Sequence, residues 1–287
     1  MRLRPAFLAA VPALALAVSA CAPVDDEPTV AADPGSDPCA TESLPLLEAG
    51  TLTIGTDSPA YEPWFADNDP TNGKGYESAV AYAVAGELGF SADEVTWVTV
   101  PFNTSYKPGA KTFDFDINQI SITPQRAEVV DFSDGYYSAA QAVVALEGTA
   151  GADATSLEDL KGLRLGAQTG TTSLTAIRDV IQPEADPLVF EDTNIAKQAL
   201  KNDQVDAILA DLPTAFYISA VEIGGSTIVG QFQVEGESSE QFGMLFEKDS
   251  ALVSCVNEAL AALEADGTMA AIEQEWLSDA VDVPELP

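Results

Sequence analysis

The chain has 287 residues, of which 46 are acidic, 12 are basic and none is histidine, and its formal net charge is −34. So negative a surface repels phosphate backbones and argues against nucleic acid as a partner. Without histidine the chain lacks the commonest general base and metal ligand, and no metal or other cofactor is expected. The length allows one large domain or two smaller ones.

The N-terminus has the pattern of a bacterial export signal. Arg2 and Arg4 precede an apolar run over residues 5–18, and small residues lead to Cys21. This pattern predicts a signal peptide over residues 1–20, too short to span a membrane. The last four residues resemble a lipobox, which predicts a lipoprotein with acyl chains (diacylglycerol, palmitate) on Cys21, anchored to the outer face of the cell membrane. An ordinary secretory signal with an incidental cysteine is the alternative.

Residues 21–43 are rich in Pro, Asp, Ala and Ser and contain almost no large apolar side chains. Such a segment cannot bury a core, and we predict a flexible tether. The two remaining cysteines, Cys39 and Cys255, predict a disulfide bond in an exported protein. Closing so long a loop stabilises a fold by about 4–5 kcal/mol at most. Two free buried thiols are the alternative.

From residue 44 onwards, strand and helix patterns alternate along the chain. In the first half, alternation predicts strands at 51–56, 95–100 and 113–117, and one apolar face predicts a helix over 76–88. For the second half we predict strands at 140–146, 163–167, 207–210 and 241–246, a helical turn at 157–160, and helices beginning at Ser173 and Thr214 and covering 196–200, 252–263 and 269–276. This order predicts an α/β fold with crossover helices.

Three places combine reactive side chains with the ends of predicted strands, where ligands gather in open α/β sheets. Arg126 follows the strand at 113–117, and a guanidinium there can bind a carboxylate through two parallel hydrogen bonds. A solvated surface arginine is the alternative. Gly170–Thr172 forms a turn between a strand and a helix, where backbone N–H groups can bind an anion. Thr171 or Thr172 can equally be a simple helix cap.

Asp211 is the third candidate, because it directly follows the strand at 207–210. A carboxylate there suits a ligand ammonium, whereas a helix cap before Pro213 is the alternative. Together the three places offer a positive group, an anion-binding backbone and a negative group. An α-amino acid requires that combination.

Several longer motifs occur in a fixed order across the chain. They are GTD (55–57), YEPWF (61–65), GKGY (73–76), SITPQRAE (121–128) leading into VDFSDGYY (130–137), SLEDLKG (156–162), GTT (170–172) and ADGT (265–268). With these motifs, the chain from about Gly50 to Leu277 resembles the polar amino-acid class of bacterial extracellular solute-binding proteins, which serve ABC importers.

The resemblance implies a two-lobed periplasmic-binding-protein-like fold, the Venus flytrap, in which each lobe is a mainly parallel sheet flanked by helices. Lobe 1 would comprise residues 44–138 and 238–287, and lobe 2 residues 139–237. The protein would be a monomeric, non-enzymatic binding protein for amino-acid transport. Its partners would be an amino acid or derivative and an importer permease, with the membrane reached only through the lipid anchor.

The resemblance also implies the ligand contacts. Arg126 would hold the ligand carboxylate with the turn that contains Gly170, Thr171 and Thr172. Ser121 and Asp211 would bind the ammonium group. Tyr61 would pack on the ligand side chain, and Asp57 and Phe102 would be further contacts.

The chain departs from the family pattern beside the expected side-chain pocket. Asn118 and Gln119 stand where small residues are usual, so the ligand's identity does not carry over. Gln119 favours a polar ligand side chain, unless its amide turns outward, and Asp57 and Glu62 would tolerate a cationic one. Two rivals stay open: a lyase or dehydratase that uses Asp57 or Asp211, and a ligand-sensing receptor outside transport.

Overall fold

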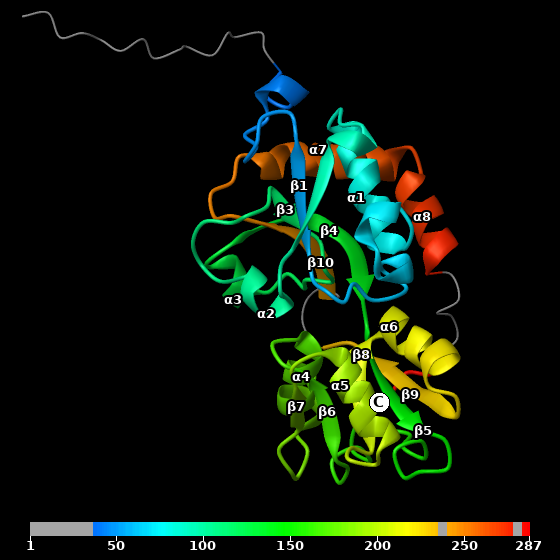
Figure 1. The fold of residues 1–287 in the computed structure, drawn as a ribbon. Coiled ribbons are helices and arrows are strands. Elements are labelled where there is room, and N and C mark those ends of the chain that lie inside the picture. The colour runs from blue at the N-terminus through cyan, green and yellow to red at the C-terminus, as the bar shows by residue number, and fades with distance from the viewer. Residues whose placement is uncertain (1–36, 235–239, 278–282) are drawn as a thin grey trace, which may run out of the picture. The chain divides into compact units, whose positions relative to one another are not determined.

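The computed structural model describes residues 37–234, 240–277 and 283–287. The expected signal peptide and the expected lipidation site, Cys21, lie outside the described residues. The described chain contains two five-stranded sheets, each accompanied by its own helices (Figure 1). Among the described helices, none is both long enough and apolar enough to cross a membrane.

Sheet 1 has the strand order β2-β1-β3-β10-β4, and sheet 2 has the order β7-β6-β8-β5-β9. The strands of sheet 1 are β1 (Leu52–Thr56), β2 (Val95–Thr99), β3 (Phe115–Asp116), β4 (Asp131–Ala139) and β10 (Glu240–Phe246). Those of sheet 2 are β5 (Gln141–Leu146), β6 (Leu165–Gln168), β7 (Leu188–Phe190), β8 (Ala207–Asp211) and β9 (Ser226–Phe232).

One strand in each sheet runs against the other four. β10 is antiparallel to both of its neighbours, β3 and β4, and the remaining pairings of sheet 1 are parallel. In sheet 2, β5 is antiparallel to both β8 and β9 in the same way. The predicted fold class, two lobes with mainly parallel sheets, is therefore confirmed, with one antiparallel strand inserted in each sheet.

Helices cover both sheets. α1 (Tyr76–Glu87), α7 (Leu252–Ala265) and α8 (Thr268–Trp276) share one apolar core with sheet 1, and α2 (Phe102–Ser105) and α3 (Pro124–Ala127) are short helices of the same lobe. Sheet 2 is accompanied by α4 (Thr172–Ala176), α5 (Thr193–Lys201) and α6 (Leu212–Tyr217), and π-helical turns extend α4 and α6. Ile208 and Leu209, adjacent in β8, belong to two different cores. Neighbouring strand residues point to opposite faces, so sheet 2 is covered on both faces.

Two of the connections between the sheets join a strand of one sheet to a strand of the other. Ala140 alone separates β4 of sheet 1 from β5 of sheet 2, and residues 233–239 connect β9 back to β10. Figure 1 shows β4 running directly into β5. β4 and β9 are edge strands of their sheets, and the strands that follow them, β5 and β10, are each second from an edge.

The last described residues correct the expected lobe assignment, which gave all of 238–287 to lobe 1. Glu285 forms a parallel bridge with Gln231 of β9, and Leu286 is buried in the core of sheet 2. The Pro287 carbonyl also accepts a hydrogen bond from the Leu157 N–H at 3.0 Å. Residues 283–287 therefore pack with sheet 2, because an apolar side chain and backbone hydrogen bonds bind them there.

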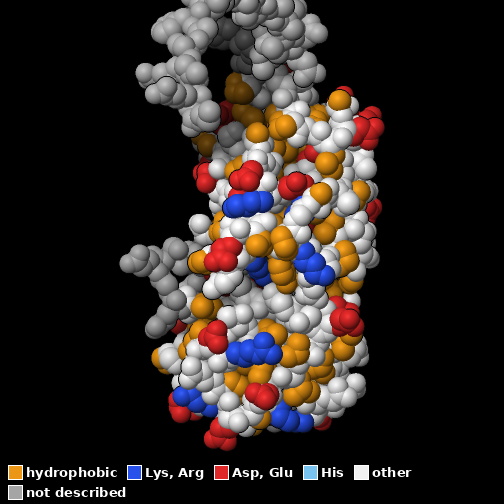
Figure 2. Space-filling view, turned by 90° about the vertical axis from the view of Figure 1, so that its left-hand side faces the viewer, with side chains coloured by type: hydrophobic (Ala, Val, Ile, Leu, Met, Phe, Trp, Pro, Cys, Tyr) orange, Lys and Arg blue, Asp and Glu red, His pale blue; other side chains and the backbone are white. Residues whose placement is uncertain are grey.

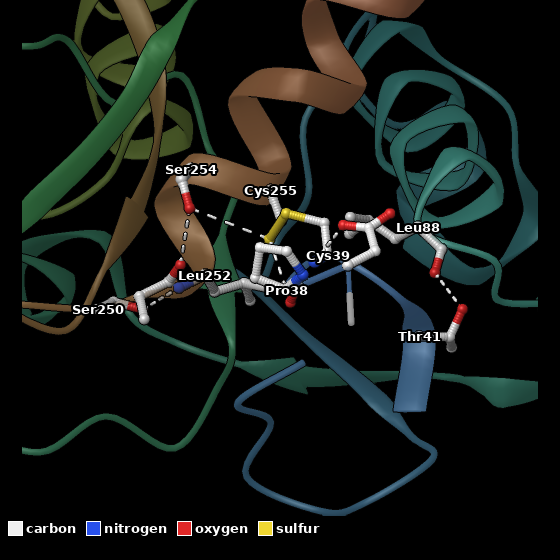
Figure 3. The surroundings of a disulfide bond; sticks show 10 residues. Pro38, Cys39, Thr41, Leu88, Ser250, Leu252, Ser254 and Cys255 are labelled. Carbon is white, nitrogen blue, oxygen red and sulfur yellow. Dashed lines mark hydrogen bonds between the residues drawn. A yellow bond between two sulfur atoms is a disulfide. The ribbon is translucent and has the colours of Figure 1, made fainter. Parts of the chain in front are cut away.

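The end of the expected tether is part of the folded structure. Cys39 and Cys255 form a disulfide bond with a Cα–Cα distance of 5.3 Å (Figure 3), which confirms the predicted pairing. Thr41 donates a side-chain hydrogen bond to the Leu88 carbonyl at 2.9 Å, and Thr41–Ser43 form a 3-10 turn. The expectation of a flexible tether up to residue 43 is wrong for 37–43, because these contacts fix the segment to lobe 1.

The acidic character of the chain is spread over its surface. On the face shown in Figure 2, acidic side chains lie scattered with Lys and Arg among them. Within the described residues, four ion pairs form: Lys161–Glu158, Arg164–Asp206, Lys197–Glu222 and Lys248–Asp131. Because acidic residues outnumber basic ones almost fourfold, most carboxylates are left to water.

Replacing both Cys39 and Cys255 with serine should lower the free energy of unfolding by about 2–5 kcal/mol, because the bond closes a loop of 216 residues. Urea denaturation of the variant and of the wild type would measure the difference. Reduction of the wild type should reproduce the variant's value. Equal midpoints for the oxidised wild type and the variant would contradict the prediction.

Candidate functional site

The candidate site is a cleft where strands of both sheets end. β1, β6 and β8 lead into Asp57, the turn at 170–172 and Asp211, and β3 leads into residues 118–121. The cleft is lined by Asp57, Tyr61, Phe102, Asn118, Gln119, Ser121, Gln168, Thr171, Thr172, Ser173, Thr193, Leu209, Ala210, Asp211 and Thr214. Eight of the ten residues expected from the sequence are in this lining. Arg126 and Gly170 are not in the lining, and the Arg126 Nη2 donates a hydrogen bond to the Gly170 carbonyl.

Arg126 is buried, with 8% of its surface exposed, so it is not the solvated surface arginine of the alternative interpretation. Its Nη1 donates to the Ser121 carbonyl at 2.7 Å, and its Nη2 donates to the Gly170 carbonyl at 3.0 Å. The guanidinium carbon also lies 5.6 Å from the centre of the Phe102 ring and 4.7 Å from that of Tyr106. Burial lowers the pKa of Arg126. The guanidinium thus connects residues that follow β3 with the turn after β6.

The Gly170–Thr172 turn has its expected conformation. Gly170 has φ +75°, and a Cβ atom there would lie 2.4 Å from the Tyr106 hydroxyl, so the position requires glycine. The Thr171 side chain caps α4 by accepting from the Leu174 N–H at 3.1 Å. Thr171 therefore acts as a helix cap, as the alternative interpretation had it, while its neighbour Thr172 turns its hydroxyl toward Ser121, 3.3 Å away.

A second group of contacts joins Asp211 to residues that the sequence analysis did not single out. The Gln141 Nε2 donates to Asp211 at 3.1 Å and to Glu240 at 3.0 Å, and the Ser121 hydroxyl donates to Glu240 at 2.5 Å. Burial, together with the charge of Glu240, raises the pKa of Asp211 well above its usual range. The Asp211 side chain makes no capping hydrogen bond to α6, and the residue lines the cleft instead.

Gln119 is in the cleft lining and is held in place by hydrogen bonds to the buried Glu77 of α1. Its backbone has a left-handed φ of +46°, its N–H donates to Glu77 Oε1 at 2.6 Å, and its side-chain amide also donates to Glu77. Tyr136 donates its hydroxyl to the same carboxylate. The Gln119 amide therefore points at the buried Glu77 rather than outward into solvent, and the residue lies in the cleft lining with a fixed orientation.

Glu77 itself is fully buried at the start of α1, and burial raises the pKa of its carboxyl group to about 7. The three hydrogen bonds that it accepts oppose this shift without cancelling it. The Glu77 carboxyl group, which contacts the lining residue Gln119, therefore titrates near neutral pH. No sequence pattern indicates this role beyond the position of Glu77 in the helix that follows GKGY.

In lobe 1, the Asp57 carboxylate is hydrogen-bonded to backbone N–H groups. Its two oxygens accept hydrogen bonds from the N–H groups of Ser58 at 2.7 Å and Phe102 at 3.1 Å, and burial raises its pKa. Among the described atoms, the buried Tyr61 hydroxyl and the buried Asn118 Nδ2 have no hydrogen-bond partner. Two unpaired polar groups in the lining are suited to a polar ligand, since buried polar groups are normally paired.

Several lining residues escaped the sequence analysis. Gln168 is the last residue of β6, and Ser173, Thr193 and Thr214 are ordinary polar residues near the starts of helices. Only their position at or after the ends of strands of sheet 2 distinguishes them. Within the described residues, no cluster of three or more Cys, Asp or Glu side chains is arranged to hold a metal ion.

Replacing Glu77 with glutamine should flatten the pH dependence of stability. Because the folded-state pKa is raised, the folded state binds more protons than the unfolded chain between about pH 4.5 and pH 7, and stability falls as pH rises through that window. Urea denaturation at pH 5 and pH 7.5 should show a smaller loss for Glu77→Gln than for the wild type. Asp116 and Asp211 also have raised pKa values, so the difference between the two slopes is the test. Parallel slopes would contradict the role of Glu77.

Comparison with known proteins identifies the family. Residues 52–279 match the model of the bacterial extracellular solute-binding proteins, family 3. The chain is 29% identical over 236 residues to the L-cystine-binding protein TcyJ of Escherichia coli (strain K12), covering 80% of this chain and 84% of that one. It is 32% identical to the solved structure of an ancestral arginine-binding protein bound to arginine, with a TM-score of 0.67 and coverage of 79% and 98%. It is also 30% identical, with a TM-score of 0.66 and coverage of 79% and 95%, to AncCDT-1, an ancestral amino acid-binding protein described as a precursor of cyclohexadienyl dehydratase. The chain belongs to family 3 of the bacterial extracellular solute-binding proteins.

Proposed function

We propose that the protein captures an amino acid or a close derivative in the cleft and delivers it to an ABC importer. The main support for this proposal is that the basic side chain of Arg126 and the acidic side chains of Asp211 and Glu240 meet around Ser121. The Arg126 guanidinium bonds to the Ser121 carbonyl, and the Ser121 hydroxyl reaches the network that contains Asp211. An α-amino acid carries the matching pair of charges on adjacent groups.

In this proposal Arg126 binds the ligand carboxylate. A guanidinium has five N–H donors, and two of them are used by the Ser121 and Gly170 carbonyls. The remaining donors and the Thr172 hydroxyl are assigned to the carboxylate. The ammonium group is assigned to Ser121 and Asp211.

The ligand side chain would run toward Tyr61, Asp57 and Gln119. Gln119 and the unpaired Asn118 amide favour a polar side chain, and the Asp57 carboxylate tolerates a cationic one. The named ligands of the relatives, cystine and arginine, have polar or cationic side chains of this kind. These observations support the class of ligand rather than one amino acid.

Capture would follow hinge closure of the two lobes, with the boundaries near residues 138 and 238. Contacts between residues of the two lobes support this: Trp64 Nε1 donates to Thr214 Oγ1 at 2.8 Å, and Arg126 reaches Gly170 at 3.0 Å. We further propose a monomer that is lipid-anchored through Cys21 outside the cytoplasm and docks on its permease. No catalytic step is proposed, and the relatives named above are binding proteins.

A thermal-shift screen of the twenty amino acids and L-cystine tests the proposal. A ligand present at a hundred times its dissociation constant should stabilise the fold by about 2.7 kcal/mol. Calorimetric titration would then give the affinity of each amino acid that raises the melting temperature. If none does so at millimolar concentration, the proposed function is wrong.

Replacing Arg126 with alanine should weaken amino-acid binding roughly thirtyfold to several thousandfold. Truncating one partner of a desolvated ion pair costs about 2–5 kcal/mol, and each 1.4 kcal/mol is about tenfold in affinity. Arg126→Lys should recover only part of the loss, because a point charge cannot reproduce the planar fork. Titration calorimetry measures both variants, and circular dichroism checks that each is folded. Near wild-type affinity in Arg126→Ala would place the carboxylate elsewhere.

Replacing Gln119 with alanine should change the ranking of amino acids more than it weakens binding in general. The side chain is in the cleft lining and is oriented by Glu77, so its loss alters the surface that meets the ligand side chain. Affinities for the screened amino acids, measured for the variant and the wild type, give the two rankings. An unchanged order would show that Gln119 does not select the ligand.

A further inference from the structure

Glu240 is the first residue of β10 and directs its carboxylate into the hydrogen-bond network of the cleft. Its Oε1 accepts from the Ser121 hydroxyl at 2.5 Å, and its Oε2 accepts from the Gln141 amide at 3.0 Å. Ser121 and Gln141 are both buried, with 2% and 0% of their surfaces exposed. The carboxylate is therefore bound through both oxygens to side chains that cannot turn away into solvent.

Asp211 and Glu240 are held close together by the same amide. The Gln141 Nε2 lies 3.1 Å from an Asp211 oxygen and 3.0 Å from a Glu240 oxygen, so the two carboxylate oxygens are at most 6.1 Å apart. Gln141 is fixed in turn by the Ser173 hydroxyl, which donates to its Oε1 at 2.6 Å. Two carboxylates at this separation oppose each other's ionisation, and a cation bound beside them in the cleft would favour the charged form of both.

Glu240 also determines what Ser121 can offer a ligand. The Ser121 hydroxyl donates its hydrogen to Glu240. One lone pair of the Ser121 oxygen then faces the Thr172 hydroxyl, 3.3 Å away, and the other is left for a donor in the cleft. An ammonium group has three N–H donors and no acceptor, and it matches both the hydroxyl oxygen and the paired carboxylates.

We propose that Glu240 is a specificity-determining residue that, with Asp211, selects a ligand carrying an ammonium group. The inference rests on the proposed function and assigns this end of the cleft to a primary ammonium of an α-amino acid. It excludes the 2-hydroxy acid of the same side chain, because a hydroxyl brings no positive charge to the two carboxylates. Glu240 acts by its charge and by positioning the Ser121 hydroxyl and the Gln141 amide.

The test compares each amino acid with its 2-hydroxy analogue. The probe pairs are L-arginine with L-argininic acid and L-glutamine with its 2-hydroxy acid, and the pair whose amino acid binds more tightly is used. Calorimetric titration gives both affinities for the wild type, for Glu240→Gln and for the control Glu128→Gln. Glu128 is an exposed carboxylate of lobe 1 outside the cleft lining, so the control removes the same charge without removing a contact to Ser121 or Gln141.

The wild type and Glu128→Gln should prefer the amino acid strongly, and Glu240→Gln should reduce the ratio of the two affinities tenfold or more. A merely structural role would weaken both compounds alike and leave the ratio unchanged, and that result would overturn the inference while the proposed function stands. If Glu240→Gln unfolds, Glu240→Asp keeps the charge and should keep the preference. Loss of preference in a folded Glu240→Asp would also count against it. A wild type that binds neither amino acid nor any other in the screen would overturn the proposed function and this inference together.

Discussion

The buried guanidinium of Arg126 is the interaction on which the rest of the cleft depends. A charge removed from water must be compensated by hydrogen bonds or counter-charges, and here two backbone carbonyls and two aromatic rings surround it. One carbonyl belongs to Ser121 and the other to Gly170, so compensation of a single side chain brings residues of both sheets together. The glycine is required because any side chain at position 170 would collide with Tyr106. One positive charge thus links the two walls of the site, together with the Trp64–Thr214 and Gln141–Glu240 hydrogen bonds.

The antiparallel strand of each sheet explains where the acidic side of the cleft comes from. Parallel strands direct their carboxyl ends to one edge, and β8 accordingly ends there with Asp211. A strand that runs the opposite way begins at that edge. Gln141, the first residue of β5, pairs directly with Asp211, and Glu240 is likewise the first residue of β10. β5 and β10, which follow the connections between the lobes, therefore begin beside the candidate site.

This geometry also separates what the sequence could predict from what it could not. Strands with clear alternation, such as β1 and β2, were predicted within a residue or two, whereas β4 carries polar residues and a glycine over DFSDGYYSA and was not recognised as a strand. Asp211 was identified because it follows a strand, and Asp57 through the resemblance to the family. Glu240 and Gln141 precede strands, and only the pairing direction, which depends on contacts distant in sequence, brings them to the cleft. The burial of Arg126 depends in the same way on Tyr106 and Gly170, which no local pattern connects.

The charges of the cleft give a physical reason for coupling between binding and closure under the proposed function. Glu240 belongs to a strand of sheet 1 and Asp211 to a strand of sheet 2, so closure brings two carboxylates together, and in an empty cleft this raises the pKa of Asp211 and disfavours its charged form. An ammonium group beside them favours the charged form instead. A ligand shifts a conformational equilibrium only by its differential affinity for the two states, and this pair of carboxylates supplies such a difference at the hinge itself. Arg126 completes the balance, because under the proposed function the ligand carboxylate meets a positive side chain that already joins the two walls.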